Sequence, residues 1–332
     1  MEVAVVKIRG ISRILASKNI SLLFVLLVVV ALFRILNPYY LAGDNIGSIL
    51  NTMSLAGMLA VGLGCLIISG QLDLSVGGVG CLGGVIAALM IQAGMSWPLA
   101  VFVALLFGVV AGLITSVFCN IFNFAAFIAT IAMQTVYRGI ALVLTNSQTV
   151  PVSDQAFWAI GDSLVFGVPV SFIIMSALFI IYGAILMYSR FGRRAYICGG
   201  NPNAARLAGI NPKKIHSVMF INCAVISSLG GVVLTARMHG ATPSNVFGTE
   251  FDAITGAVLG GIAFTGGKGG MLGCFLGVLL LSCFNNGMVG IGLQPFWSLV
   301  ARGSLLIIAL SVDYLRESTR LKALKTAKLR NA

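Results

Sequence analysis

Residues 45–93 read NIGSILNTMSLAGMLAVGLGCLIISGQLDLSVGGVGCLGGVIAALMIQA. Two long apolar runs in this stretch flank a short polar segment, residues 69–78 (SGQLDLSVGG), and Asp73 is the one charged residue of the whole stretch. A helix of about 20 apolar residues is long enough to cross the roughly 30 Å hydrocarbon core of a membrane. The stretch therefore predicts two membrane-spanning helices that are separated by a few polar residues.

The composition of the whole chain points the same way. Of its 332 residues, 58% are hydrophobic and only 9% are charged, and the mean hydropathy is +1.03. Soluble domains carry roughly 25% charged residues, so this composition excludes a soluble enzyme, a disordered protein and a nucleic-acid-binding protein. The 40 glycines fit close packing between membrane helices. We therefore expect an all-α, polytopic membrane protein that contacts lipid.

Apolar runs along the chain predict about ten membrane-spanning helices. Each run of about 17–25 residues is counted as one span; the eighth run is short and rich in glycine, and a half-helix is the alternative to a full crossing there. The predicted spans are residues 20–37, 45–69, 77–93, 97–119, 125–144, 168–188, 216–236, 252–266, 271–290 and 295–312. They form a transmembrane domain over residues 20–312, between an N-terminal segment, residues 1–19, and a basic tail, residues 313–332.

The net charge of +12 comes mostly from three basic clusters, which hold sixteen of the 21 lysines and arginines. The clusters are Lys7, Arg9, Arg13 and Lys18; Arg190, Arg193, Arg194, Arg206, Lys213 and Lys214; and Arg316, Arg320, Lys322, Lys325, Lys328 and Arg330. Short loops rich in Lys and Arg stay in the cytoplasm. Both termini and the loop 189–215 are therefore predicted to be cytoplasmic, and an even number of spans agrees with this.

Loops on the other side of the membrane should be poor in Lys and Arg. Residues 145–167 and 238–251 contain neither, and the span count places both outside. Each loop could bind a soluble external partner or simply connect two spans. The first apolar run could also be a signal peptide, but Arg34-Ile-Leu-Asn-Pro follows it in place of a small-residue cleavage site, which favours an uncleaved span.

The seven cysteines predict neither a disulfide framework nor a metal site. Six of them lie inside apolar runs, where cysteine behaves as a small hydrophobic residue, and Cys198 lies in the basic loop. No Cys-x-x-Cys pair occurs. Residues 261–268 resemble a phosphate-binding loop superficially, but Ile262 and Gly269 stand where that pattern needs glycine and Ser or Thr. We expect no cofactor and no ATP site on this chain.

The segment 69–78 is the first candidate functional element. A carboxylate near the hydrocarbon core, as Asp73 would be, normally faces a cavity, a partner or water. The neighbouring glycines allow a broken or re-entrant helix, which is tolerated where protein or a water-filled path surrounds the backbone. Gln71, Asp73 and Ser75 are therefore candidates for a transport path or gate. Alternatively, Asp73 or Ser75 caps the next helix by accepting hydrogen bonds from its free amides.

Polar amides within the spans are a second set of candidates. Gln134, Asn285 and Asn286 lie in otherwise apolar runs. Sugar hydroxyls need paired donors and acceptors, which amides provide, so these residues are also predicted to line a substrate path. Amides inside a bundle also bond to neighbouring helices, and that alternative stays open.

The cytoplasmic loop contains a predicted short helix, residues 201–209. Asn201 is a suitable N-cap, Pro202 suits the first helical position, and Gly209 is a natural stop. Its small residues are expected to be exposed and to enter a groove on a partner protein, with a merely structural turn as the alternative. The candidate coupling residues are Arg193, Arg194, Gly200, Asn201, Ala204, Ala205, Arg206, Leu207 and Gly209.

At these stretches the chain resembles the permease subunits of bacterial ATP-binding-cassette sugar importers of the ribose type. Members typically carry Ser-Gly-Gly-Ile-Asp-Leu-Ser-Val-Gly, and residues 69–77 differ from it at Gln71 and Leu72. Further blocks match in order between residues 45 and 312. They are Phe127-Ile-Ala-Thr130 with Arg138-Gly139, Gly199-Gly-Asn201, Arg206-Leu-Ala-Gly-Ile210, Glu250-x-Asp-Ala-Ile254 with Gly260-Gly261, and Asn285-Asn-Gly287.

This resemblance implies a ten-span, non-catalytic permease of the bacterial inner membrane. Its partners would be a second permease copy or a paralogue, cytoplasmic ATP-binding subunits that hydrolyse ATP, and a periplasmic sugar-binding protein. Related permeases carry branched-chain amino acids or a furanosyl signal molecule, and the sequence does not separate these cargoes from a pentose or hexose. An ion-coupled secondary transporter is the rival from another class, and it would need titratable residues at the middle of the membrane.

Overall fold

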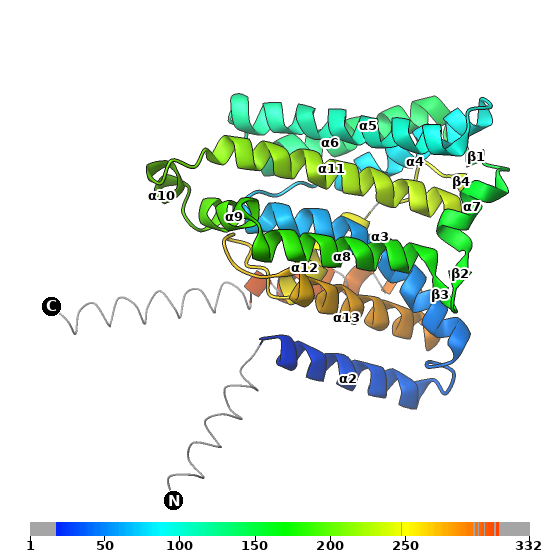
Figure 1. Ribbon diagram of the computed structural model, residues 1–332. Helices are drawn as coiled ribbons and strands as arrows, with labels where there is room; N and C mark the ends of the chain where they lie inside the picture. Colours follow the sequence, from blue (N-terminus) through cyan, green and yellow to red (C-terminus); the bar gives the residue numbers. More distant parts are fainter. Residues whose placement is uncertain are drawn as a thin grey trace, which may run out of the picture.

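The computed structural model describes residues 18–246, 248–294, 296–297, 299–301, 303–308 and 310–311. These residues form a bundle of long helices with roughly aligned axes (Figure 1). The basic tail and nearly all of the N-terminal segment, which the charge pattern assigns to the cytoplasm, lie outside the described residues.

The long helices follow the apolar runs closely, because each run can satisfy its backbone hydrogen bonds internally as a helix. They are α2 (Lys18–Leu36), α3 (Gly43–Ile68), α4 (Val76–Gln92), α5 (Trp97–Ser116) continued by the π-helix η1 (Val117–Ile121), α6 (Ala126–Thr145), α8 (Val170–Tyr188), α11 (Pro212–Arg237), α12 (Thr249–Leu259) and α13 (Met271–Gly290). The shorter elements are α7 (Gln155–Asp162), α9 (Arg190–Gly200), α10 (Pro202–Leu207), β1 (Val150–Pro151), β2 (Leu164–Val165), β3 (Val168–Pro169) and β4 (Gly240–Ala241).

Seven of the described helices are long and apolar enough to cross a membrane: α2, α3, α5 with η1, α6, α8, α11 and α13. The predicted third span corresponds to α4, which has only 17 residues, and the predicted tenth is helical at the described residues between 299 and 308. The all-α class is confirmed, whereas the count of ten crossings stays a prediction.

The predicted eighth span, residues 252–266, was wrong in its bounds. α12 begins at Thr249 and ends at Leu259. The chain then turns through a run of glycines, among which Gly261 and Gly266 have positive φ angles of 89° and 83°, a backbone conformation that ends a right-handed helix. Eleven residues extend about 16 Å, so α12 by itself covers only half of a roughly 30 Å hydrocarbon core.

α11 is the central helix, and it packs against α3, α4 and α5. Its contact with α4 is closest at Gly231, where an added Cβ would overlap the carbonyl oxygen of Gly80. Close backbone approach at small residues is typical of helices packed in membranes. The outer helices instead expose apolar side chains, for example Phe24 on α2, Phe102 on α5 and Ile128 on α6, which suits contact with lipid.

The two ends of the bundle differ in structure. One end, called here the α10 end, carries α9, α10 and the loop between α12 and α13 (Figure 1). The other, called the α7 end, carries α7 and two small antiparallel sheets. β1 pairs with β4 through Val150↔Ala241 and Pro151↔Gly240, so the loops 145–167 and 238–251 meet there. β2 pairs with β3 and closes the loop before α8.

All seven cysteines are free thiols; six are buried and Cys119 is partly exposed. Among the described residues, no group of three or more His, Cys, Asp or Glu side chains lies close enough to hold a metal ion.

Candidate functional site

The break between α3 and α4 places a carboxylate inside the bundle. Asp73 is fully buried, and its Oδ1 accepts hydrogen bonds from the Ser75 backbone amide at 2.7 Å and from the Ser75 hydroxyl at 2.6 Å. Its Oδ2 has no hydrogen-bond partner among the described residues. The two bonds hold the turn that precedes α4, and neither the Asp73 nor the Ser75 side chain accepts a hydrogen bond from an amide of α4 itself, so the geometry does not support the capping interpretation.

α4 begins deep in the bundle and not at its surface. The His216 Nε2 lies 3.0 Å from the carbonyl oxygen of Ser69, near the start of α11, whereas Gly80 in the first turns of α4 lies against the Ser227 carbonyl. Eleven residues of α11 separate these two levels, which is about 16 Å of helix. The chain between Gly70 and the start of α4 is therefore non-helical while it crosses part of the depth of the bundle. Gln71 lies in this segment, with its Nε2 3.4 Å from the His216 Nδ1.

A second break brings a glutamate to the start of α4. The chain returns from β4 into the bundle, and α12 begins at Thr249 with Glu250 and Asp252 in its first turn, both buried. The Gln134 side chain on α6 lies between the two helix starts: its Oε1 accepts from the Gly78 amide at 2.5 Å, and its Nε2 donates to Glu250 Oε1 at 3.2 Å. We call Gly78, Gln134 and Glu250 the polar cluster.

Electrostatics explain why a carboxylate is stable at this place. The N-terminal ends of helices carry unpaired amides and a partial positive charge, which favour an anion. Glu250 sits in the first turn of α12 and next to Gly77 in the first turn of α4. The glycines leave the space that it occupies, because an added Cβ on Gly77 would lie 2.5 Å from Glu250 Oε2.

The polar cluster borders a narrow crevice between α4, α6 and the turn before α12. Its lining residues are Gly77, Gly78, Cys81, Gln134, Arg138, Pro243 and Asn245. The crevice has no room for a water molecule. A polar solute could pass here only if α4, α6 and α12 moved apart.

Asn285 and Asn286 lie elsewhere in the bundle. Asn286 on α13 accepts a hydrogen bond from the Asn45 Nδ2 on α3 at 3.0 Å, and the same nitrogen donates to the Tyr40 carbonyl at 2.6 Å. The Tyr40 hydroxyl in turn donates to the Cys283 carbonyl at 2.7 Å. Asn286 thus joins α13 to α3 and does not contact the polar cluster, which fits the interhelical-bonding alternative. Asn285 Oδ1 has no hydrogen-bond partner within the described part of the chain.

The predicted short helix of the basic loop is confirmed as α10, which projects from the α10 end (Figure 1). Asn201 Oδ1 accepts from the amides of Asn203 and Ala204, both at 3.0 Å, and Pro202 is the first helical residue. Gly209 has a φ of 73° and ends the helix.

One prediction about α10 was wrong. Ala205 is fully buried, because α10 packs back on α9, whereas the side chain of Leu207 is 91% exposed. Arg193, Arg194, Gly200, Asn201, Ala204, Arg206 and Gly209 are exposed as well. The surface offered to a partner is therefore formed by the other residues of α10 and by the arginines of α9.

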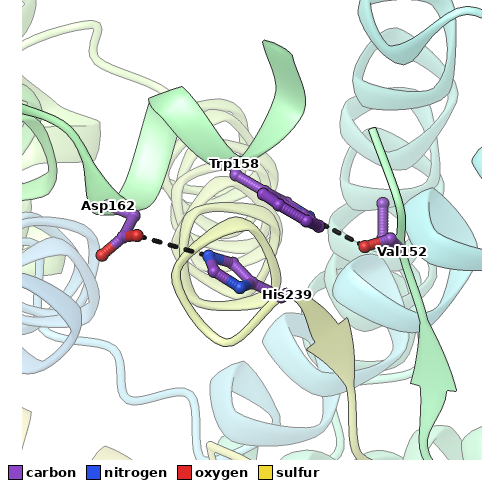
Figure 2. A network of polar contacts seen from close by, with 4 residues as sticks. All are labelled: Val152, Trp158, Asp162 and His239. Atoms are coloured by element: carbon purple, nitrogen blue, oxygen red, sulfur yellow. Dashed lines mark hydrogen bonds and ion pairs between the residues drawn. The ribbon is translucent and has the colours of Figure 1, made fainter. Parts of the chain in front are cut away.

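The α7 end is held together by a small aromatic and polar network (Figure 2). The Trp158 ring on α7 stacks on His239, with ring centroids 4.1 Å apart, and its Nε1 donates to the Val152 carbonyl at 2.8 Å. His239 Nε2 lies 3.3 Å from an Asp162 oxygen. These contacts fix α7 against the corner that follows α11. They explain how two loops distant in sequence form one surface.

Sequence reasoning missed Glu250 as a partner of Gln134. The available signal was a pair of carboxylates, Glu250 and Asp252, immediately before an apolar run. This pair of carboxylates did not indicate which helix would lie against it in the fold.

Comparisons with known proteins identify the family. Residues 45–310 match the family model described as "Branched-chain amino acid transport system / permease component". The chain is 35% identical to the ribose import permease protein RbsC of Bacillus subtilis over 88% of this chain and 90% of that protein. It is 34% identical to the D-allose transport system permease protein AlsC of Escherichia coli, over 88% and 90% of the two chains.

The L-arabinose ABC transporter permease protein AraH of Azospirillum brasilense is 30% identical, over 94% of this chain and 91% of that protein. No solved structure matches the chain. Seven apolar helices and a family match over most of the length make it a multi-pass membrane protein. The chain belongs to the permease family described as branched-chain amino acid transport system / permease component.

Proposed function

We propose that the chain is the transmembrane permease subunit of an ATP-driven importer that moves a monosaccharide, a ribose-like pentose or a related sugar, across a bacterial inner membrane. The observation that carries this proposal is the 35% identity to a ribose import permease over 90% of that protein's length. Permeases named for allose and arabinose are similar over comparable lengths, which favours a sugar over an amino acid or a furanosyl signal molecule.

The polar cluster is the best-supported part of the substrate path. Gln134 presents both a donor and an acceptor, and Glu250 presents acceptor oxygens, which together match the hydroxyls of a sugar. Binding sites typically place a few such groups in a mainly apolar wall. The cluster lies where two helices begin inside the bundle, as expected for broken helices that line a path. Gln71, Asp73 and Ser75 belong to the segment that leads to it.

The sidedness of the chain follows from its charges. The basic residues of α9, α10 and the start of α11 gather at the α10 end, whereas the described part of the α7 end carries Asp44, Asp154 and Asp162 beside Arg34 and Arg237 (Figure 1). We infer that the α10 end faces the cytoplasm. The N- and C-termini then lie there too, if α4, α12 and the last helix complete ten crossings. The segment 69–78 would be a re-entrant element on the cytoplasmic side.

In this proposal the partners act at opposite ends. A periplasmic binding protein would deliver the sugar at the α7 end, and a second permease copy or a paralogue would complete the path within the membrane. Cytoplasmic ATP-binding subunits would hydrolyse ATP and dock on α10, where Arg206 and Leu207 are exposed. Binding and hydrolysis of ATP shift the equilibrium between two arrangements of the permease only if the ATP-binding partner has different affinities for those two arrangements.

The test is uptake of radiolabelled D-ribose by proteoliposomes that contain the chain with its ATP-binding and sugar-binding partners. Gln134→Leu removes both hydrogen bonds of the polar cluster and leaves Glu250 with one donor fewer. A loss of about 1–3 kcal/mol at a buried polar site corresponds to a fall in uptake of roughly 5–150-fold. The matched control is Thr135→Val, because Thr135 is exposed on the same helix and its hydroxyl bonds within that helix.

Two results would contradict the proposal. Uptake that continues without ATP but stops when the proton gradient is collapsed would indicate a secondary transporter. Equal uptake by Gln134→Leu and Thr135→Val would remove the polar cluster from the substrate path.

A further inference from the structure

Three backbone segments meet at the α10 end, and we call their meeting point the glycine junction. The segments are residues 68–70 at the end of α3, residues 199–200 at the end of α9, and residues 266–267 in the loop between α12 and α13. They are far apart in the sequence, and glycine is present in all three.

The contacts at the glycine junction are between backbones, with no side chain in between. The Gly267 amide donates to the Ile68 carbonyl at 2.9 Å. A Cβ added to Gly199 would overlap that carbonyl oxygen and would lie 2.7 Å from the Gly267 amide nitrogen. A Cβ added to Gly266 would lie 2.9 Å from the Gly70 Cα. Side-chain rearrangement therefore cannot absorb a displacement of one segment against the others.

Two side-chain hydrogen bonds lie beside the glycine junction and connect it to neighbouring helices. The Tyr196 hydroxyl on α9 donates to the Gly269 carbonyl at 2.8 Å. The His216 ring at the start of α11 lies 3.0 Å from the Ser69 carbonyl. The glycine junction is thus tied to α9 and to the central helix α11 as well as to α3.

Each segment of the glycine junction leads directly to an element of the proposed mechanism. Gly200 is followed by Asn201, which caps α10. Gly70 begins the non-helical segment that leads to α4, and the first turn of α4 contains Gly78. Gly266 lies seven residues after α12, whose first turn holds Glu250. The segments that lead to α10, to the start of α4 and to the C-terminal end of α12 therefore contact one another at the glycine junction.

We propose that the glycine junction is the mechanical link that transmits a displacement of α10 to α4 and α12, and so opens or closes the polar cluster. This inference rests on the proposed function as an ATP-driven permease. Tightly packed contacts transmit strain because they have few alternative arrangements. In this assignment Gly199 is a positioning residue: it contacts neither sugar nor ATP, and it keeps α9 in register with α3 and the loop 260–270.

The test is Gly199→Ala in the complete transporter, reconstituted with its ATP-binding subunits and sugar-binding protein. The added methyl group must push α9 away from the Ile68 carbonyl. We expect the variant complex to assemble and to hydrolyse ATP, while the number of D-ribose molecules imported per ATP falls about tenfold, within the usual range of coupling between sites. This ratio is the decisive readout, because a purely structural defect would lower assembly and hydrolysis together with uptake.

Gly270→Ala is the matched control in the same region. Gly270 has an extended backbone with a φ of −168°, and an added Cβ would meet no atom within 4 Å. We expect its import-to-hydrolysis ratio to stay within about twofold of the wild type, because the substitution leaves the coupling between sites unchanged.

The outcomes separate this inference from the proposed function. A wild-type complex that shows no ATP-driven ribose uptake would refute the proposed function. A working wild type with an unchanged ratio in Gly199→Ala would refute the glycine junction as the link and leave the proposed function intact. If Gly199→Ala does not assemble, Tyr196→Phe decides, because it removes one hydrogen bond across the junction without adding atoms. A ratio reduced severalfold supports the link, and an unchanged ratio overturns it.

Discussion

The contact between α4 and α11 allows a direct test of whether glycine packing fixes the distance between helices in the bundle. A Cβ built on Gly231 of α11 lies 1.7 Å from the carbonyl oxygen of Gly80 on α4. An ordinary C···O contact is about 3.3 Å or longer, so Gly231→Ala must open this contact by about 1.6 Å. Forcing extra atoms into a packed core costs roughly 1–3 kcal/mol, and occasionally more.

Gly230→Ala is the matched control on the neighbouring residue. A Cβ there lies 3.1 Å from a terminal methyl carbon of Leu59, which can rotate away. Both variants gain the same helix preference of alanine over glycine, about 1 kcal/mol, and this gain cancels between them. We therefore expect the free energy of unfolding of Gly231→Ala to be about 1–3 kcal/mol lower than that of Gly230→Ala.

The assay is equilibrium unfolding of the purified chain in mild detergent with increasing amounts of SDS. It should be followed by a measurement of ribose uptake, because a shift of α4 also changes the geometry of the hydrogen bond between Gly78 and Gln134. Unfolding midpoints that coincide for the two variants would show that α4 and α11 adapt freely, and would refute the argument that backbone contact fixes their separation.

Three further substitutions test single contacts. Asn201→Ala removes the acceptor for two amides of α10, so it should destabilise that helix by about 1 kcal/mol and lower ribose import per ATP, whereas Asn201→Asp should preserve both. Asn286→Leu breaks the bond to Asn45 and should cost about 1–2 kcal/mol of unfolding free energy with no change in the KM for ribose; a raised KM would place Asn286 on the path. Asp162→Asn removes the negative charge next to His239, and because both side chains are exposed the unfolding free energy should change by less than about 1 kcal/mol. A larger loss would contradict this assignment of a weak surface pair.

Apolar runs determine where most long helices lie, because a membrane helix needs little more than length and hydrophobicity. The predicted span 45–69 corresponds to Gly43–Ile68, and the predicted span 168–188 to Val170–Tyr188. Span eight failed for a physical reason. Residues such as Ile262 and Ala263 are apolar and buried although they lie in a glycine turn, and hydropathy does not distinguish a buried loop from a helix.

The candidate site could be predicted only in part. Gln134 stands out in the sequence as an amide within an apolar run. Its partner Glu250 is 116 residues away, and their pairing depends on the turn before α12 entering the bundle, which no local pattern shows. Asn286 has the same sequence character as Gln134 but bonds to Asn45 instead. Exposure of Ala205 was predicted because α10 was expected to present its small residues to a partner, yet small size equally suits the packing of α10 on α9.

The state of the native thiols has a practical consequence for spectroscopy. None is bonded to another, and all but Cys119 are shielded from solvent, so hydrophilic maleimide dyes should react slowly with the unmodified chain. A cysteine substituted for Leu207, where the side chain is 91% exposed, should therefore be labelled selectively once Cys119 is replaced, without removing the six buried cysteines. A fluorophore at that position would report when α10 leaves water and enters a partner's groove.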